Sequence, residues 1–204
     1  MKLAAALVLP LLVTAPALAR VVTLDFETVT SFASIDTFYA GGTDSAGAAG
    51  TNLGVRFGLN ALGRQNDAVG TYFSNAPSPL GVMSLAGEAT MNVLVGFTNL
   101  SFHYASTDVV AGAVEIWSGL NATGTLLASL GLAANAQAGG CTNAAYCNFS
   151  LLSTSLGQTR AFSVKFADSA TVAAFDNVAL TVPEPTSALL AALGLAGLAF
   201  SRRR

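Results

Sequence analysis

The amino-acid sequence predicts an all-β fold, a single antiparallel β-sandwich with a jelly-roll-like arrangement. Apolar and polar residues alternate in several short runs, as they do in strands with one buried face. Gly, Asn and Asp separate these runs, and no helical stripe of comparable quality precedes residue 182. Only 10% of the residues are charged, against about 25% in ordinary soluble domains. Period alone does not distinguish a jelly roll from other sandwiches.

The expected strands lie between residues 22 and 182. The clearest is 162–166, in which Phe162, Val164 and Phe166 alternate with Ser163 and Lys165. The other strands and their inward-facing residues are 22–27 (Val22, Leu24, Phe26), 55–59 (Val55, Phe57, Leu59), 100–104 (Leu100, Phe102, Tyr104), 114–117 (Val114, Ile116) and 178–182 (Val178, Leu180, Val182). Residues 41–50, rich in Gly and Ala, predict a mobile loop.

Residues 1–19 have the pattern of a secretory signal peptide. Lys2 provides a positive start, residues 3–12 are apolar, and Ala17 and Ala19 are the small residues that signal peptidase reads. Two prolines in this stretch argue against an N-terminal helix of the domain. We therefore expect cleavage before Arg20 and an exported domain at residues 20–181.

The C-terminal segment 182–204 has three parts. Val182-Pro183-Glu184-Pro185 comes first, an uncharged run at 188–200 follows, and Arg202-Arg203-Arg204 ends the chain. A helix over 188–200 would be about 20 Å long, short of the roughly 30 Å hydrocarbon core. This predicts a marginal transmembrane helix, with the arginines as a stop-transfer signal on the cytoplasmic side. Three terminal charges and an apolar composition on all sides argue against a buried core helix.

This three-part tail resembles the sorting signal of the PEP-CTERM family of exported bacterial proteins. Pro183-Glu184-Pro185, the apolar run and the basic terminus match that signal in order and spacing. The resemblance implies a Gram-negative bacterium that makes exopolysaccharide, and an exosortase that recognises the motif and removes the tail. The precursor would be anchored transiently in the inner membrane and then pass to the cell surface or the extracellular matrix.

The domain left after removal of both signals is acidic. It keeps five Lys and Arg against ten Asp and Glu residues, a net charge near −5. Without a basic cluster, such a domain is a poor nucleic-acid binder. Its length of about 160 residues suffices for one hydrophobic core.

Cys141 and Cys147 are the two cysteines of the chain. In an exported protein, such a close pair predicts a local disulfide that orders the surrounding loop. Zinc binding would need further Cys or His ligands, and a redox motif would have the spacing Cys-x-x-Cys.

The first and last expected strands carry acidic residues. Asp25 and Glu27 follow the start of the domain, and Asp176 and Asn177 precede its end. This resembles the ends of extracellular jelly-roll domains, including carbohydrate-binding modules and MAM-like adhesion domains, in which these two strands lie together. The resemblance implies a structural calcium ion on Glu27 and Asp176, with Asn177 and Asp25 as weaker ligands, because calcium prefers hard oxygen donors. The alternative is a solvent-facing strand and a turn or bulge.

Three function classes remain. The first is a non-catalytic surface or matrix protein associated with exopolysaccharide or biofilm. The second is a carbohydrate-binding module, with Trp117 and Tyr146 as glycan contacts, provided that Trp117 is not a core residue. The third is a glycoside hydrolase or lyase, which needs two carboxylates in a cleft. His103, the single histidine, lies mid-strand without a nucleophile motif, and we expect no enzyme.

Overall fold

Eleven β-strands occur in residues 19–68 and 70–183, which, together with Gly194, are the residues that the computed structural model describes. The strands are β1 (Ala19–Leu24), β2 (Val55–Phe57), β3 (Ala61–Gln65), β4 (Gly81–Leu85), β5 (Ala89–Phe97), β6 (Asn99–Ser106), β7 (Val110–Trp117), β8 (Leu126–Leu132), β9 (Ser150–Ser155), β10 (Ala161–Phe166) and β11 (Ala173–Pro183). A single 3₁₀ turn in these residues, η1 (Ala138–Gly140), lies between β8 and β9.

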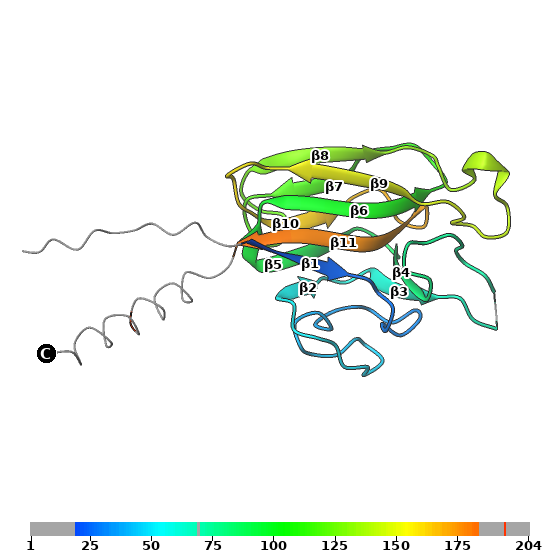
Figure 1. Ribbon diagram of the computed structural model, residues 1–204, viewed down its shortest axis with the longest axis horizontal. Coiled ribbons are helices and arrows are strands. Elements are labelled where there is room, and N and C mark those ends of the chain that lie inside the picture. Colours follow the sequence, from blue (N-terminus) through cyan, green and yellow to red (C-terminus); the bar gives the residue numbers. More distant parts are fainter. Residues whose placement is uncertain (1–18, 69, 184–193, 195–204) are drawn as a thin grey trace, which may run out of the picture. The chain divides into compact units, whose positions relative to one another are not determined.

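The strands form two antiparallel sheets (Figure 1). The first sheet has the order β3-β4-β11-β6-β9, and β1 pairs with the C-terminal half of β11. The second sheet has the order β2-β5-β10-β7-β8. Each pairing between these strands is antiparallel. The prediction of an all-β, antiparallel two-sheet fold is therefore confirmed.

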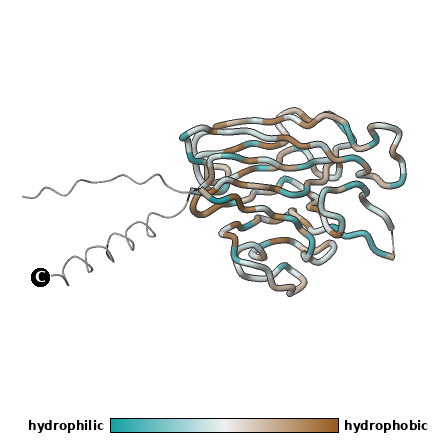
Figure 2. Tube along the Cα trace, in the orientation of Figure 1, coloured by the Kyte–Doolittle hydropathy of each residue, from teal (hydrophilic) through white to brown (hydrophobic). Residues whose placement is uncertain are grey.

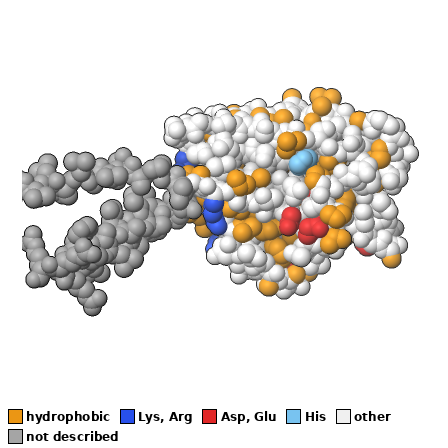
Figure 3. Space-filling model, in the orientation of Figure 1, with side chains coloured by type: hydrophobic (Ala, Val, Ile, Leu, Met, Phe, Trp, Pro, Cys, Tyr) orange, Lys and Arg blue, Asp and Glu red, His pale blue; other side chains and the backbone are white. Residues whose placement is uncertain are grey.

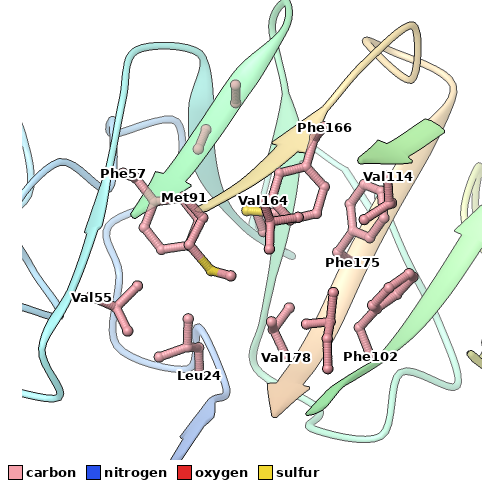
Figure 4. Close-up of a cluster of buried hydrophobic side chains, with 14 of the residues drawn as sticks. Leu24, Val55, Phe57, Met91, Phe102, Val114, Val164, Phe166, Phe175 and Val178 are labelled. Carbon is pink, nitrogen blue, oxygen red and sulfur yellow. The ribbon is translucent and has the colours of Figure 1, made fainter. Parts of the chain in front are cut away.

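The core lies between the inner faces of the two sheets (Figure 4). Phe175 of β11 contacts Phe166 of the facing sheet edge to face, with ring centroids 4.9 Å apart. Phe102 of β6 packs on the other side of Phe175 at 5.6 Å. Offset and edge-to-face ring pairs of this kind add to the stabilisation from burial alone. The hydrophobic residues run along the strands, and hydrophilic residues are frequent in the loops (Figure 2).

The predicted alternation is confirmed in β6, β7 and β11. Leu100, Phe102 and Val114 are buried, as are Val178 and Leu180, whereas the residues between them are less buried. This outcome follows from the period of two, which places alternate side chains on opposite faces.

Two inward-facing assignments were wrong. In β10, a register shift between Ala161 and Ser163 leaves Phe162 half-buried while Ser163 is buried. The irregularity displaces Phe162 from the core face, whereas Val164 and Phe166 are buried as predicted. Ser163 faces outward and is buried there by the turn that contains Gly119 and Ala122. Leu59 lies beyond the end of β2 and is 76% exposed.

A second hydrophobic cluster lies apart from the main core. Its buried members are Phe73, Val82, Ala105, Ala136, Tyr146 and Ala174. The predicted disulfide between Cys141 and Cys147 is present and closes the loop that carries Tyr146. This loop is joined to residues 72–75, because Ser74 N donates to the Tyr146 carbonyl at 2.9 Å and Asn75 Nδ2 to the Cys147 carbonyl at 3.0 Å. The disulfide thus fixes a loop that packs on a neighbouring segment.

Residues 41–50 are organised around a buried carboxylate, in contrast to the mobile loop that their composition predicts. Asp44 Oδ2 accepts from Thr30 N at 2.9 Å, and Asp44 Oδ1 accepts from Ala46 N at 3.0 Å and Ala48 N at 2.9 Å. Burial raises the pKa of the Asp44 carboxyl, but the hydrogen bonds outweigh burial and hold the pKa below its ordinary value. No motif in the sequence indicates that this one side chain binds three backbone amides.

Replacing Asp44 should destabilise the fold. Asp44→Ala leaves three amides without their acceptor, and each donor left unsatisfied costs about 1–3 kcal/mol, with the low end applying where water reaches the amide. We expect the free energy of unfolding to fall by about 3 kcal/mol in urea titrations. The control is Asp108→Ala, since Asp108 is exposed, and it should change stability by less than about 0.5 kcal/mol. Equal effects of the two variants would contradict the role of Asp44.

Candidate functional site

The start of the sorting motif belongs to a strand. Val182 and Pro183 are the last residues of β11, where Val182 pairs with Arg20 and Pro183 with Ala19. Val182 is only 2% exposed, so β11 extends two residues beyond the predicted domain end at 181. Several residues of the predicted signals lie outside the described residues: Ala17, Glu184, Pro185, the run 188–200 apart from Gly194, Arg202, Arg203 and Arg204. In the part of the chain that the structure describes, no helix has the length and apolarity needed to cross a bilayer.

The first and last strands lie side by side, as expected. Leu24 of β1 pairs with Val178 of β11, so the segment after β1 reaches the middle of β11. At that point β11 has a register shift between Asp176 and Ala179, and Asn177 adopts a φ of 47°. The irregularity turns the Asp176 carboxylate toward residues 78–81. The predicted acidic residues are thus brought to one end of the first sheet.

Backbone amides and one hydroxyl bind these carboxylates. Asp176 is 0% exposed; its Oδ2 accepts from Ser78 N at 2.8 Å, and its Oδ1 accepts from Ser78 Oγ at 2.5 Å and Asn177 N at 2.6 Å. Glu27 Oε1 accepts from Leu80 N and Gly81 N at 2.8 and 2.9 Å. The backbone of residue 81 approaches so closely that an added Cβ would collide with the carbonyl of residue 26. The carboxylates therefore tie the loop before β4 to β1 and β11.

This arrangement does not fit a calcium ion. Within residues 19–68 and 70–183, no group of three or more His, Cys, Asp or Glu side chains lies together as a metal site. Calcium takes six to eight oxygen ligands, whereas the oxygens of Asp176 already accept three hydrogen bonds. The Asp25 carbonyl accepts a hydrogen bond from Ser78 Oγ, and Asp25 Oδ1 accepts one from Glu27 N. Calcium binding stays a prediction, and these hydrogen bonds account for the same residues without it.

Asp176 has a perturbed acidity. Burial raises the pKa of its carboxyl to about 6, against the opposing effect of hydrogen bonds from Ser78 and Asn177, and the nearby Glu27 charge raises it further. The ion pair found among the described residues joins Lys165 of the second sheet to Glu88. In this part of the chain, therefore, no cation forms an ion pair with Asp176. The fold therefore favours the protonated form of Asp176.

Trp117 lies on the outer face of the second sheet. Its neighbour Ile116 is fully buried in the core, whereas Trp117 and Glu115 are half-buried on the opposite face. Trp117 Nε1 donates to Glu115 Oε2 at 3.3 Å, and Lys165 pairs in register with Glu115 and forms an ion pair with Glu88 at 3.0 Å. Trp117 is thus not a core residue, which the sequence left undecided.

Tyr146 lies beside the first sheet, whereas Trp117 belongs to the second sheet. Tyr146 is buried in the second hydrophobic cluster, and its hydroxyl donates to the Thr171 carbonyl at 2.8 Å. Burial raises its pKa. Tyr146 is thus buried by packing rather than exposed on a surface, and its role as a glycan contact stays a prediction.

His103 lies on the outer face of the first sheet. Figure 3 shows the single histidine of the chain on this face among hydrophobic and uncharged polar side chains. His103 Nδ1 is buried without a hydrogen-bond partner within the described residues, and burial lowers the pKa of the imidazole. Both cysteines are in the disulfide. In residues 19–68 and 70–183, no hydrogen bond joins His103 to a Ser or Cys nucleophile.

The C-terminal residues match a known family model. The model of the PEP-CTERM protein-sorting motif matches residues 181–204. The two-sheet domain is thus followed directly by a PEP-CTERM sorting motif, as the sequence predicted. This motif marks an exported protein that an exosortase sorts toward the cell surface.

The domain itself has weaker similarities. The K2 cleaved adhesin domain of Lys-gingipain is 14% identical, with a TM-score of 0.49 over 80% of this chain and 100% of that one. A family 6 carbohydrate-binding module is 17% identical, with a TM-score of 0.37 over 62% and 89%. These similarities are too weak to carry an argument. A search of curated proteins found no match.

The raised pKa of Asp176 predicts a pH dependence of stability. Because the folded-state pKa of about 6 exceeds the ordinary 3.8, the group stabilises the fold most below pH 4, and this contribution is lost as pH rises through about 6. The loss amounts to about 3 kcal/mol. Urea titrations from pH 4 to 7.5 should show this decline for the native protein relative to Asp176→Asn, which does not titrate. Parallel curves for the two proteins would contradict the assignment.

The carboxylate geometry also predicts the effect of metal removal. Because Asp176 and Glu27 are bound by protein donors, the melting temperature should not change between EDTA and millimolar calcium. Differential scanning calorimetry at pH 7.5 measures both conditions. A fall of several degrees in EDTA, absent in Asp176→Asn, would restore the calcium hypothesis.

Proposed function

We propose that this protein is a non-catalytic component of the cell surface or extracellular matrix that associates with exopolysaccharide. The observation that carries the proposal is the sorting motif at residues 181–204, which begins within β11. The exported part is then the acidic two-sheet domain, released from a transient membrane anchor by an exosortase. We infer a jelly-roll-like topology for it, since the orders β1-β11-β6-β9 and β5-β10-β7-β8 alternate strands distant in sequence.

The absence of catalysis is part of the proposal. Glycoside hydrolysis requires two carboxylates on either side of a substrate cleft. Glu27 and Asp176 are near enough to influence each other, but Asp176 is completely buried and both side chains are bound to residues 78–81. This supports a structural role for the pair rather than a hydrolase or lyase.

A carbohydrate-binding role is favoured by the position of Trp117. An indole ring on the outer face of a sheet offers an apolar surface on which a sugar ring can stack, while its N–H is satisfied. Here Glu115 accepts the indole N–H, and Lys165 pairs in register with Glu115. We therefore place the polysaccharide contact on the outer face of the second sheet.

Removal of the Trp117 ring should weaken polysaccharide binding. The purified mature protein is titrated with exopolysaccharide from the same bacterium by isothermal calorimetry. We expect Trp117→Ala to reduce the affinity about tenfold, since an aromatic contact of about 1.4 kcal/mol corresponds to that factor.

The matched control is Phe32→Ala. Phe32 is 49% exposed and lies outside the second sheet, where it contacts Arg64 and Tyr72. This variant should bind as the native protein does. Equal losses in both variants, or native binding by Trp117→Ala, would overturn the assignment to this face. A native protein that binds no exopolysaccharide would overturn the proposed function itself.

A further inference from the structure

A polar pocket lies beside β2 and β5 at the second sheet. Asp36, Thr37, Arg56, Asn92 and Asn121 are among the residues that line it. They come from the segment before β2, from β2, from β5 and from the turn between β7 and β8. Asn92 and Trp117 pair in register with the same residue of β10, so they lie two strand spacings apart, about 10 Å.

The turn between β7 and β8 forms one wall of the pocket. Thr123 N donates to the Leu120 carbonyl at 3.2 Å, and Asn121 and Ala122 both have positive φ angles, 55° and 54°. These angles define a type I′ turn, which suits Asn at its first central position. Ala122 is strained there, because an L-residue with a Cβ rarely adopts this conformation. Contacts with residues outside the turn therefore stabilise its conformation.

Two side chains of the sheet supply these contacts. Ser163 is fully buried; its Oγ accepts from Ala122 N at 3.0 Å and donates to the Gly119 carbonyl at 2.6 Å. Asn92 Oδ1 accepts from Asn121 N at 2.7 Å, and Asn92 Nδ2 donates to Asn121 Oδ1 at 2.8 Å. The turn is thus folded onto the outer face of the sheet, and the Asn121 amide is fixed at the pocket.

The side-chain atoms of the pocket that remain free to bind a ligand include hydrogen-bond donors and an acceptor. With Asn121 Oδ1 occupied, both N–H bonds of its Nδ2 are free in the described structure. Arg56 is exposed and takes no part in the ion pair found among the described residues. Asp36 Oδ1 accepts from Ser34 Oγ, which leaves its Oδ2 as an acceptor. The pocket therefore offers the Arg56 cation, the Asp36 carboxylate and the Asn121 amide, whereas Asp44, a second carboxylate in its lining, is bound by three backbone amides.

We propose that this pocket binds an uncharged sugar residue of a polysaccharide through adjacent hydroxyl groups. A hydroxyl both donates and accepts, so neighbouring hydroxyls match the combination of Arg56, Asn121 and Asp36. Arg56 offsets only one of the two carboxylates that line the pocket, Asp36 and Asp44, so a negative charge remains there and, with the acidic domain, disfavours a polyanion. Because the turn is fixed before binding, little ordering cost opposes the contact. The inference rests on the proposed function and names the class of ligand for the same outer face.

The test uses the neutral and acidic fractions of exopolysaccharide from the same bacterium, separated by anion exchange. Calorimetric titration of the mature protein should show binding to the neutral fraction. Arg56→Gln and Asn121→Ala should each weaken it about tenfold, as expected for loss of a hydrogen bond involving a charged group or a fixed amide. Melting temperatures establish that each variant is folded.

Two controls separate the pocket from general effects. Arg160→Gln removes an exposed arginine elsewhere and should leave the affinity unchanged. Phe32→Ala changes an exposed side chain outside the second sheet and should likewise leave the affinity unchanged.

The outcomes are distinguishable. Binding that is weakened by Trp117→Ala but not by Arg56→Gln or Asn121→Ala would overturn the pocket and keep the proposed function. Binding to the acidic fraction alone would overturn the uncharged ligand. No binding of the native protein to either fraction would overturn both proposals.

Discussion

The pairing of β1 with β11 is the constraint on which the rest of the domain depends. Six residue pairs, from Ala19 with Pro183 to Leu24 with Val178, join the two ends of the described domain. The pairing places Leu24 and Val178 in the core between the sheets. It also brings the segment after β1 to the irregular part of β11, where Glu27 and Asp176 bind residues 78–81. The two expected domain boundaries, before Arg20 and after residue 181, consequently both fall within this pair of strands.

The outer faces of the two sheets differ in the structures that cover them. At one end of the first sheet, the segment around Phe73 and the disulfide loop with Tyr146 form a second hydrophobic cluster. The outer face of the second sheet carries Trp117 and the fixed turn at Asn121 instead. Buried polar side chains organise both regions, Asp176 in the first sheet and Ser163 in the second. Hydrogen bonds to backbone groups explain why these two polar residues are found in the interior.

Much of the fold could be predicted from the sequence, because a period of two identifies strands with one buried face. The alternation was correct where the strands are regular, as in β6, and wrong at Phe162, where the register shifts. The disulfide and the sorting motif depend on residues close together in sequence, and both were recognised. The pocket could not be found, since Asp36, Arg56, Asn92 and Asn121 come from four segments and have no motif. The burial of Tyr146 could not be predicted, because a tyrosine in a loop can still be covered by packing.

The central claim is that the outer face of the second sheet, with Trp117 and the Asn121 turn, contacts polysaccharide. Amide chemical shifts of the isotope-labelled mature protein, followed by NMR during addition of oligosaccharides from the neutral exopolysaccharide fraction, test it most directly. Shift changes should be concentrated in β2, β5, β7 and the turn at 118–125, and the outer face of the first sheet around His103 should be unchanged. Changes confined to the first sheet, or none at saturating oligosaccharide, would contradict it.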